Sequence, residues 1–264
     1  MSKKIRSLER GLLVVESLNK TLKPLNLQQL HDITKLDKAT LLRVLVTLEE
    51  SGWVYRNMGD KCYRLTYQIH ELGEHIQSHD ALVQIAAPVL AELQQEVVWP
   101  SDLAIYNGDC MEIVETSRRR SPMVINREIM GFEADMLLSA MGRAYLAWSS
   151  EEERKKIVDR LRRIKTEGSA RYDAISFARE LDLVLERGYA VREEGLWGGV
   201  LDSEFEEVSA IAVPIIVMGE VQACVNLVWL NSLSQPGDIE SVFYPKLAYA
   251  ADKIAGLLKA NQMY

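Results

Sequence analysis

Residues 38–50 carry side chains that could hydrogen-bond to a polar partner from one face of a helix. Leu41, Leu45 and Leu48 recur at three- and four-residue intervals, which predicts a helix with one buried stripe. At about 100° per residue, the opposite face carries mostly small or hydrogen-bonding side chains, namely Ala39, Thr40, Arg43, Thr47 and Glu50. Arginine on such a face can form a two-pronged contact with guanine. The face is therefore suited to the major groove of DNA.

The stretches on either side of this helix predict a winged helix-turn-helix. Residues 27–34 show helical spacing of apolar side chains and would brace the helix over 38–50. Asp37 can accept hydrogen bonds from the free N–H groups at the start of that helix. Residues 53–55 and 63–65 are predicted to form two strands joined by a turn, which is the wing. The alternative is that the same three-helix packing serves only as a protein-interaction module.

Basic side chains around this unit are candidates for contacts with DNA phosphates. Lys38 lies in the first turn of the helix over 38–50. An opening helix over 5–18 carries Arg6 and Arg10 near its start. Its apolar face would hold Leu8, Leu12, Val15 and Leu18. Arg56 lies beside the wing, within reach of the DNA backbone or minor groove. We expect base contacts from Ala39, Thr40 and Arg43, and phosphate contacts from Lys38, Arg6, Arg10 and Thr47.

The charge of the chain changes sign along its length. Residues 1–70 carry 12 basic and 7 acidic side chains, whereas the remainder carries 19 and 31, within a net charge of −7. A basic head can neutralise phosphates while an acidic body disfavours non-specific association. Ordinary variation in surface charge is the alternative explanation for counts this small.

The cysteines and the absence of long apolar runs indicate the compartment. Cys62, Cys110 and Cys224 are odd in number and form no C-x-x-C pair, so we expect free thiols. No run of about 18 apolar residues occurs. The sequence therefore predicts a cytoplasmic protein that makes no membrane contact.

Motifs typical of enzymes and metal sites are missing from the sequence. It has no G-x-S-x-G, no G-x-x-x-x-G-K-[ST], no H-E-x-x-H and no G-x-G-x-x-G. The acidic pair Glu193-Glu194 is more typical of a solvated surface than of acid–base catalysis. His75 and His79 lie four residues apart on a predicted helix but lack a further ligand nearby. We therefore expect no catalytic residue, no metal and no cofactor.

Five motifs keep one order along nearly the whole chain. They are SLERGL at 7–12, KATLLRVL at 38–45 followed by Thr47, Leu48 and Gly52, MGRAYLA at 141–147, RGYA at 187–190, and IAVP at 211–214. Together they resemble the isocitrate lyase regulator (IclR) family of bacterial transcription factors. The middle and late segments look closest to the regulators of 3-hydroxyphenylpropionate degradation. The resemblance implies a ligand-responsive DNA-binding regulator. A small-molecule sensor that acts through protein partners is the alternative.

The sequence predicts an α+β fold in two domains. A winged helix-turn-helix over 1–66 leads through a linker helix over 67–81 to an effector-binding, GAF-like domain over 82–264, with a mixed sheet and helices. Hairpins are expected at 103–115 and 208–229, the first because Asn107-Gly108 favours a tight turn. Pro88 should break or kink its helix unless it lies in the first turn.

The effector pocket is predicted from positions at which this chain differs from the family that it resembles. Family members that sense small oxo-acids have small polar residues where this chain has Asn226 and Val228, Cys at the position of Ala210, and Lys at the position of Arg143. These exchanges argue against a glyoxylate-like ligand. A pocket for a flat, partly apolar molecule is expected instead. Its lining would be Tyr106, Met141, Trp197, Cys224, Asn226 and Val228.

Two further residues could hold the anionic end of such a ligand. Arg127 can form a two-pronged carboxylate contact, and Ser139 at a helix start can add donors. A surface ion pair with Glu128 or Glu133 is the alternative for Arg127. We therefore expect an aromatic carboxylate, such as a hydroxyphenylpropionate or similar phenolic acid, bound within 100–230.

The expected macromolecular partners are double-stranded operator DNA and further copies of the chain. One helix-turn-helix contacts few base pairs, and two-fold dimers on palindromic sites are the usual remedy. We expect a homodimer or homotetramer. Candidate interface residues are Leu12, Val15, Ile69, Leu72 and Ile76, for each of which burial inside the monomer is the alternative.

Overall fold

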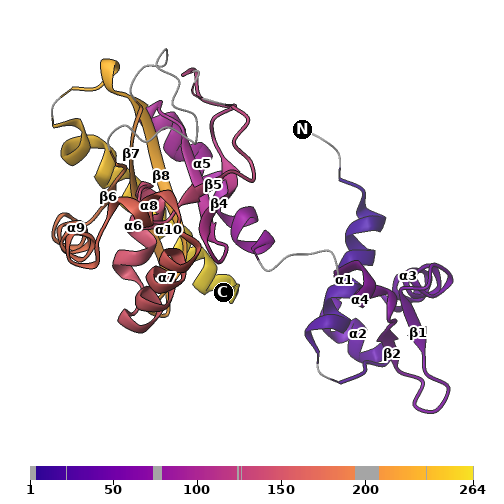
Figure 1. The fold of residues 1–264 in the computed structure, drawn as a ribbon. Coiled ribbons are helices and arrows are strands. Elements are labelled where there is room, and N and C mark those ends of the chain that lie inside the picture. Colours follow the sequence, from indigo (N-terminus) through magenta and orange to yellow (C-terminus); the bar gives the residue numbers. More distant parts are fainter. Residues whose placement is uncertain are drawn as a thin grey trace. The chain divides into compact units, whose positions relative to one another are not determined.

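The computed structural model describes residues 4–21, 23–73, 79–123, 125, 127–193, 208–235 and 237–263. Its contacts divide the chain into two compact units, Met1–Gln77 and Ser78–Tyr264, which follow the colour bar of Figure 1 from indigo to yellow. The first unit is mainly helical, and the second combines a sheet with helices. The expected α+β class with an N-terminal winged helix-turn-helix is therefore confirmed.

The first unit packs three helices and a small hairpin around one apolar core. The helices are α1 (Arg6–Lys20), α2 (Leu27–Thr34) and α3 (Lys38–Glu50). The wing is the antiparallel pair β1 (Val54–Arg56) and β2 (Tyr63–Leu65), and the short helix α4 (Gln68–Gly73) follows it. The core contains Val14, Leu18, Leu25, Leu30, Leu41, Leu45, Val54 and Tyr63.

Side-chain caps begin both α2 and α3. The Asn26 side chain accepts the backbone N–H of Gln29 at 3.0 Å, and the Asn26 N–H donates to Oε1 of Gln29 at 2.8 Å. Asp37 begins α3 as predicted, because its Oδ1 accepts the N–H of Thr40 at 2.8 Å. Each cap satisfies N–H groups that a helix start leaves without partners. The caps therefore fix where the two helices begin.

The buried face of α1 differs from the predicted one. Val14 and Leu18 are buried, whereas Leu8 and Leu12 are exposed and Val15 is half-buried. The helix carries two apolar stripes, and the packing of α1 against α2 and α3 buries the one that contains Val14. The prediction was wrong for Leu8 and Leu12, which form an open apolar stripe on the described unit.

The second unit is built on a sheet in the order β5-β4-β3-β8-β7-β6. Every pairing between the described strands is antiparallel. The strands are β3 (Ser101–Tyr106), β4 (Cys110–Thr116), β5 (Glu133–Asp135), β6 (Ala190–Val191), β7 (Val208–Val217) and β8 (Glu220–Leu230). Both predicted hairpins are present, with turns at 107–109 and 218–219.

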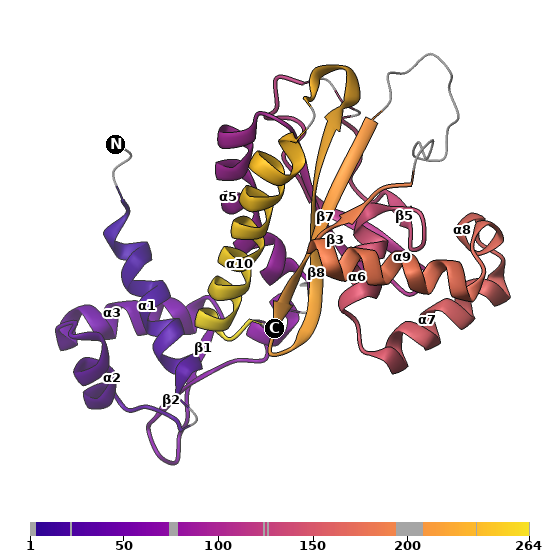
Figure 2. The same ribbon diagram turned by 90° about the vertical axis from the view of Figure 1, so that its left-hand side faces the viewer.

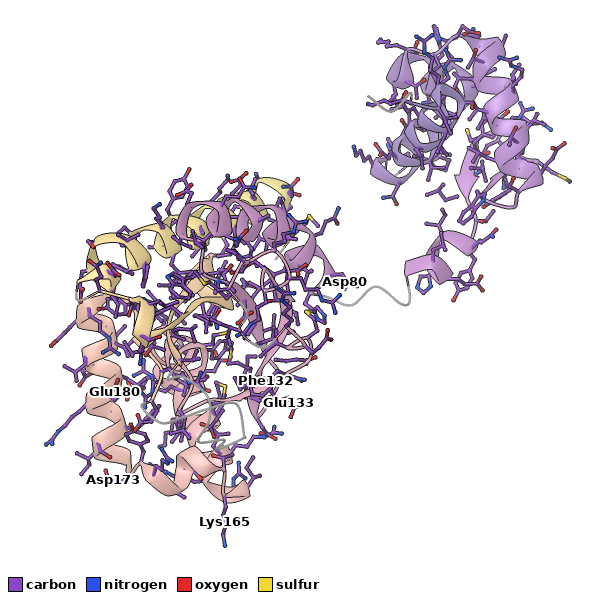
Figure 3. All side chains as sticks on the ribbon, turned by 90° about the horizontal axis from the view of Figure 1, so that it is seen from above. Asp80, Phe132, Glu133, Lys165, Asp173 and Glu180 are labelled. Carbon is purple, nitrogen blue, oxygen red and sulfur yellow. The ribbon has the colours of Figure 1, made fainter. Side chains whose placement is uncertain are left out.

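Helices cover both faces of this sheet, as Figure 2 shows. They are α5 (Asp80–Val97), α6 (Ala140–Trp148), α7 (Glu151–Ile164), α8 (Glu167–Arg171), α9 (Ala174–Arg187) and α10 (Tyr244–Asn261), with short turns at Asn231–Leu233 and Ile239–Phe243. α5 and α10 pack together on one face, while α6 lies on the other with α9 against it. Asp173 and Glu180 mark α9, and Lys165 marks the end of α7, in Figure 3.

Several details depart from the expected elements. α5 continues through Pro88, so the proline does not break this helix. β5 and α8 were not predicted, because each is too short to show a period. The linker region contributes α4, and residues 74–78 lie outside the described residues. None of the helices in the described part of the chain is long and apolar enough to span a membrane.

Candidate functional site

The outward face of α3 is open in the first unit. Ala39, Arg43 and Thr47 are exposed, as the helical spacing predicts. Thr40 is only 9% exposed, because α1 packs beside it, so its predicted place on the outward face is wrong. The hydroxyl of Thr47 donates to the carbonyl of Arg43 at 3.0 Å, so in this arrangement it can only accept a further bond.

Two apolar side chains that the sequence did not assign also lie on this face. Leu42 is 43% exposed and Val46 is 48% exposed, although both follow residues of the buried stripe. Leu42 and Val46 were not predicted on this face, because an apolar residue beside a buried leucine is ordinarily assigned to the core. The outward face of α3 is therefore polar along one edge and apolar along the other.

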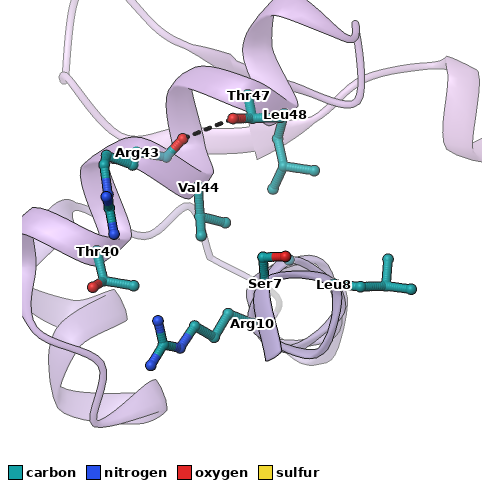
Figure 4. A pocket seen from close by; sticks show the side chains of 9 residues that line it. Ser7, Leu8, Arg10, Thr40, Arg43, Val44, Thr47 and Leu48 are labelled. Carbon is teal, nitrogen blue, oxygen red and sulfur yellow. Dashed lines mark hydrogen bonds between the residues drawn. The ribbon is translucent and has the colours of Figure 1, made fainter. Parts of the chain in front are cut away.

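A groove of about 570 Å³ runs between α1 and α3, and Figure 4 shows its lining. The side chains of Arg10, from α1, and Arg43, from α3, both extend toward the end of the groove where Thr40 lies. Neither guanidinium forms an ion pair with a carboxylate of the described residues. Two cations beside an open groove will attract an anion such as a phosphate.

The other predicted phosphate contacts lie around this groove and on the wing. Arg6 and Lys38 are exposed at the starts of α1 and α3. The Nε of Arg56 donates to the carbonyl of Lys61 at 3.1 Å, and its guanidinium lies 5.5 Å from the centre of the Tyr63 ring. Arg56 is thus held against its own hairpin while its outer edge stays exposed.

An ion pair also braces the wing turn. Nη1 of Arg64 donates to Oδ1 of Asp60 at 3.0 Å. Hydrogen bonds from Arg64 and from the backbone of Cys62 lower the pKa of Asp60 to about 2. The turn therefore keeps a charged carboxylate at physiological pH, and Arg64 is already occupied by it.

In the second unit, four of the predicted effector residues share one sheet face. Side chains alternate along strands, so Tyr106 of β3 and Cys224, Asn226 and Val228 of β8 point to the same side. The ring of Tyr106 stacks on Tyr145 of α6 with centroids 4.9 Å apart, which identifies this side as the one that α6 covers.

Of these four residues, only Tyr106 lines a groove that the described residues outline. Tyr106 lies at the far end of β3 from the strand position that pairs with Asn226, and it lines a groove of about 450 Å³ with Tyr145 and Gln222. Cys224 and Val228 are buried. Burial raises the pKa of the Cys224 thiol, which therefore stays protonated.

Asn226 belongs to a buried polar cluster centred on Asp102. The Asp102 N–H donates to Oδ1 of Asn226 at 2.7 Å, and Nδ2 of Asn226 donates to Oδ2 of Asp102 at 3.2 Å. Arg118 donates to the same carboxylate through Nε at 2.9 Å and Nη2 at 2.7 Å, and the Thr116 hydroxyl donates at 2.7 Å. Asp102 is completely buried and Arg118 nearly so.

A second guanidinium lies close to this cluster. Burial and the nearby charge of Arg118 lower the pKa of Arg192 to about 10. No spacing pattern in the sequence predicts this cluster, because Arg118 and Asn226 lie 16 and 124 residues from Asp102.

The remaining predicted effector residues have structural contacts or lie apart. Oγ of Ser139 accepts the N–H of Gly142 at 3.0 Å and so caps α6, while Met141 is buried beside it. Arg127 is exposed and makes no recorded contact with the other predicted effector residues that the structure describes. Of the two carboxylates considered as its ion-pair partners, Glu128 binds Arg119 instead. Trp197 lies outside the described residues.

The MGRAYLA segment has a structural role that explains its glycine and arginine. A Cβ on Gly142 would lie 2.4 Å from the backbone of Met136, so only glycine fits there. The buried guanidinium of Arg143 donates to the carbonyls of Leu137 at 2.8 Å and Val191 at 3.0 Å, and it also binds Glu193. Arg143 therefore ties α6 to β6 rather than presenting itself to a ligand.

Among the residues that the structure describes, no three His, Cys, Asp or Glu side chains gather as a metal site. The groove between α1 and α3 offers two guanidinium groups to an anionic partner, whereas Asp102 pairs with Arg118 inside its cluster.

Comparison with known proteins covers both units. Residues 7–57 match the model of the IclR helix-turn-helix domain, and residues 74–255 match the bacterial transcriptional regulator IclR C-terminal model. The DNA-binding transcriptional repressor YiaJ of Escherichia coli is 27% identical over 243 residues, which cover 88% of this chain and 81% of the relative. The Pca regulon regulatory protein of Pseudomonas putida is 24% identical over 247 residues, covering 93% and 81%.

Solved structures share the fold at low identity. IclR of Thermotoga maritima aligns with a TM-score of 0.54 and 21% identity, covering 97% of this chain and 99% of that one. An IclR homolog from Microbacterium hydrocarbonoxydans, complexed with 4-hydroxybenzoate, aligns with a TM-score of 0.53 and 21% identity, covering 96% and 99%.

Proposed function

The chain belongs to the IclR family of bacterial transcriptional regulators, and from that premise we propose that it controls genes of aromatic-acid catabolism in response to an aromatic carboxylate. It acts in the cytoplasm on operator DNA. The observation that carries the DNA-binding part is the exposed face of α3 beside two guanidinium groups that no described carboxylate neutralises.

In this proposal, α3 lies in the major groove and its neighbours hold the DNA backbone. Arg43 and Ala39 meet base edges, since arginine pairs well with guanine. Lys38, Arg6, Arg10 and Thr47 meet phosphates, and Arg56 reaches the backbone or minor groove from the wing. Salt should weaken binding steeply, because these contacts release counterions.

Fluorescence anisotropy on an operator selected from random duplexes tests this assignment. Arg43→Ala should cost about 1–3 kcal/mol at one base-pair position, whereas Lys38→Ala should weaken binding evenly across sequences. Arg162→Ala, at an exposed position in the second unit, is the matched control and should change neither the affinity for the operator nor the base preference. Unchanged affinity and specificity in Arg43→Ala would show that another element reads the bases. A protein that selects no sequence at all would favour action through protein partners.

For the effector, we propose a phenolic acid such as a hydroxyphenylpropionate, bound on the α6 side of the sheet. The support is that Arg118 and Arg192 lie close enough for the charge of Arg118 to lower the pKa of Arg192. Val228, on the same face of β8 as Asn226, is buried and apolar. Placed cations near apolar side chains suit a carboxylate on an apolar body. Arg127, although exposed, stays a candidate for the carboxylate contact. The relative that is complexed with 4-hydroxybenzoate gives a precedent in another protein.

Calorimetry with a panel of ligands tests this effector class. Aromatic acids should bind, whereas glyoxylate and pyruvate should not. Arg127→Ala is compared with Arg119→Ala, an exposed arginine in the same loop region. Loss of aromatic-acid binding only in Arg127→Ala would support the predicted contact. Tight binding of oxo-acids alone would refute the proposed ligand class.

We also propose a homodimer or homotetramer whose interface includes the open stripe of α1 and residues of the linker region. Leu12 is exposed on α1 and Leu72 is exposed on α4, so neither is needed by the core of the described unit. Val15 and Ile69 are half-buried, and Ile76 lies outside the described residues. Light scattering should give a dimer or larger species for the full chain, and Leu12→Asp should shift it toward monomer.

A further inference from the structure

The apolar edge of α3 does not belong to the core that the described residues of the first unit form. Leu41 and Leu45 fill the core, while Leu42 and Val46, one position further along, are 43% and 48% exposed. Exposed branched side chains on a helix contribute nothing to the core and cost solvation free energy. Their position on the outward face needs a separate explanation.

Helical geometry places these two residues beside the proposed base-reading positions. At about 100° per residue, Val46 and Leu42 lie about 20° and 60° to one side of Ala39. Arg43 and Thr47 lie about 40° and 80° to the other side. A surface that follows α3 from Ala39 past Arg43 to the next turn therefore also reaches Val46, and one as wide as a DNA groove reaches Leu42.

The major groove offers one apolar group to such an edge, the C5-methyl of thymine. We propose that Leu42 and Val46 read thymine methyl groups, so that this edge specifies A·T pairs while Arg43 specifies a guanine. This inference rests on the proposed function, because it assumes that α3 enters the major groove. It adds the identity of the bases that the apolar edge selects.

The spacing of the two residues gives the spacing of the thymines. Four residues of α-helix rise about 6 Å, and successive base pairs are about 3.4 Å apart. A helix lying along the groove therefore places Leu42 and Val46 about two base steps apart. The operator should carry two thymines at this separation on the side away from the Arg43 guanine.

A second copy of the chain fits this edge less well than DNA does. Arg43 and Thr47 flank the apolar pair closely on the same helix face, and no described carboxylate neutralises Arg43. An apolar contact between two copies would bring two such cations together, which is unfavourable. The phosphates and base edges of DNA accept both the cation and the apolar edge.

The test replaces single thymines of the selected operator by deoxyuridine, which removes only the methyl group. Fluorescence anisotropy with the full chain should show about fourfold weaker binding for each methyl that is read, the effect expected for one buried methyl group. Thymines elsewhere in the operator should show no change.

Protein variants then assign each methyl to a residue. Leu42→Ala and Val46→Ala should each abolish the thymine preference at one position while the other preference remains. Ile33→Ala is the matched control, because Ile33 of α2 is 49% exposed but lies on another helix. Its thymine preferences should equal those of the unchanged protein. Thermal unfolding confirms that the variants are folded, and Leu42→Gln repeats the test at similar volume.

Three results would overturn the inference while leaving the proposed function standing. The first is specific binding that deoxyuridine does not weaken at any position. The second is a deoxyuridine effect that survives in both Leu42→Ala and Val46→Ala. The third is dissociation of the oligomer by Leu42→Ala with equal losses of affinity for thymine and uracil duplexes. Failure to select any DNA sequence would instead refute the proposed function itself.

Discussion

Replacing Asp102 by asparagine should destabilise the second unit strongly. Asp102→Asn keeps the size and shape of the side chain but removes its charge, and it leaves the buried guanidinium of Arg118 without its carboxylate. The carboxylate accepts two hydrogen bonds from Arg118, one from Thr116 and one from Asn226. An asparagine has only one oxygen to accept them, and its NH₂ group would face other donors.

The expected loss of stability follows from the burial of the Asp102–Arg118 ion pair. Breaking a buried ion pair by removing one partner costs about 3–5 kcal/mol. For a domain of this size, each kcal/mol lowers the melting temperature by about 2–4 °C, so the sheet unit should melt about 6–20 °C lower. The double variant Asp102→Asn/Arg118→Met should recover part of this loss, because no uncompensated charge from this pair stays buried.

Glu128→Gln provides the control within the same part of the chain. Glu128 pairs with Arg119 at 2.9 Å, but their side chains are 83% and 72% exposed. Solvent screens such pairs, so the control should not measurably change the melting temperature. Differential scanning calorimetry of the full-length variants measures both. Equal melting temperatures for Asp102→Asn and Glu128→Gln would refute the view that Asp102 holds this end of the sheet together.

Three further outcomes are expected. Gly142→Ala should destabilise the second unit by about 1–3 kcal/mol or more, since the new Cβ would meet the Met136 backbone. Gly256→Ala in α10 has open space around it, so it should stabilise the unit by about 0.5–1 kcal/mol. Chemical denaturation measures both changes in the free energy of unfolding. The cap hydrogen bonds lower the pKa of Asp37. Its stabilisation of α3 is therefore present above pH about 4 and is lost as the pH falls through the lowered pKa. In Asp37→Ala, the fall of the melting temperature with decreasing pH should be smaller. The Cys224 thiol, buried and with a raised pKa, should react with a thiol reagent only after unfolding, and rapid labelling of native protein would contradict its burial.

Local sequence signals predicted the helix-turn-helix well. Asp37 caps α3 because a carboxylate three residues from the N–H of Thr40 can bond to it whatever the rest of the chain does. The wing strands also depend on neighbouring residues, and they pair as expected. By contrast, α1 carries two apolar stripes, and only its packing partners decide that Val14 is buried and Leu12 exposed.

The buried polar cluster around Asp102, in contrast, could not be predicted from local sequence signals. Asp102 lies at the start of a strand with nothing unusual about its neighbours, and its partners come from β4, the following loop and β8. Such pairs arise only once the sheet order is set, so no spacing rule finds them. Arg118 lies in the polar stretch Thr116 to Ser121, and nothing in that stretch indicates that its side chain is buried.

Burial decides which arginine is the stronger candidate for a ligand carboxylate. An exposed guanidinium such as Arg127 is screened by water and salt, so its contact with an anion contributes less than a buried contact would. The pKa of Arg192 is lowered by burial and by the charge of Arg118. A negative charge beside Arg192 is therefore less screened by solvent than one beside Arg127. A ligand carboxylate near Arg192 should therefore raise that pKa. The same contact would stabilise the second unit through linkage between ligand binding and folding. The proposed aromatic acid suits such a contact, because its ring tolerates apolar side chains around the charge.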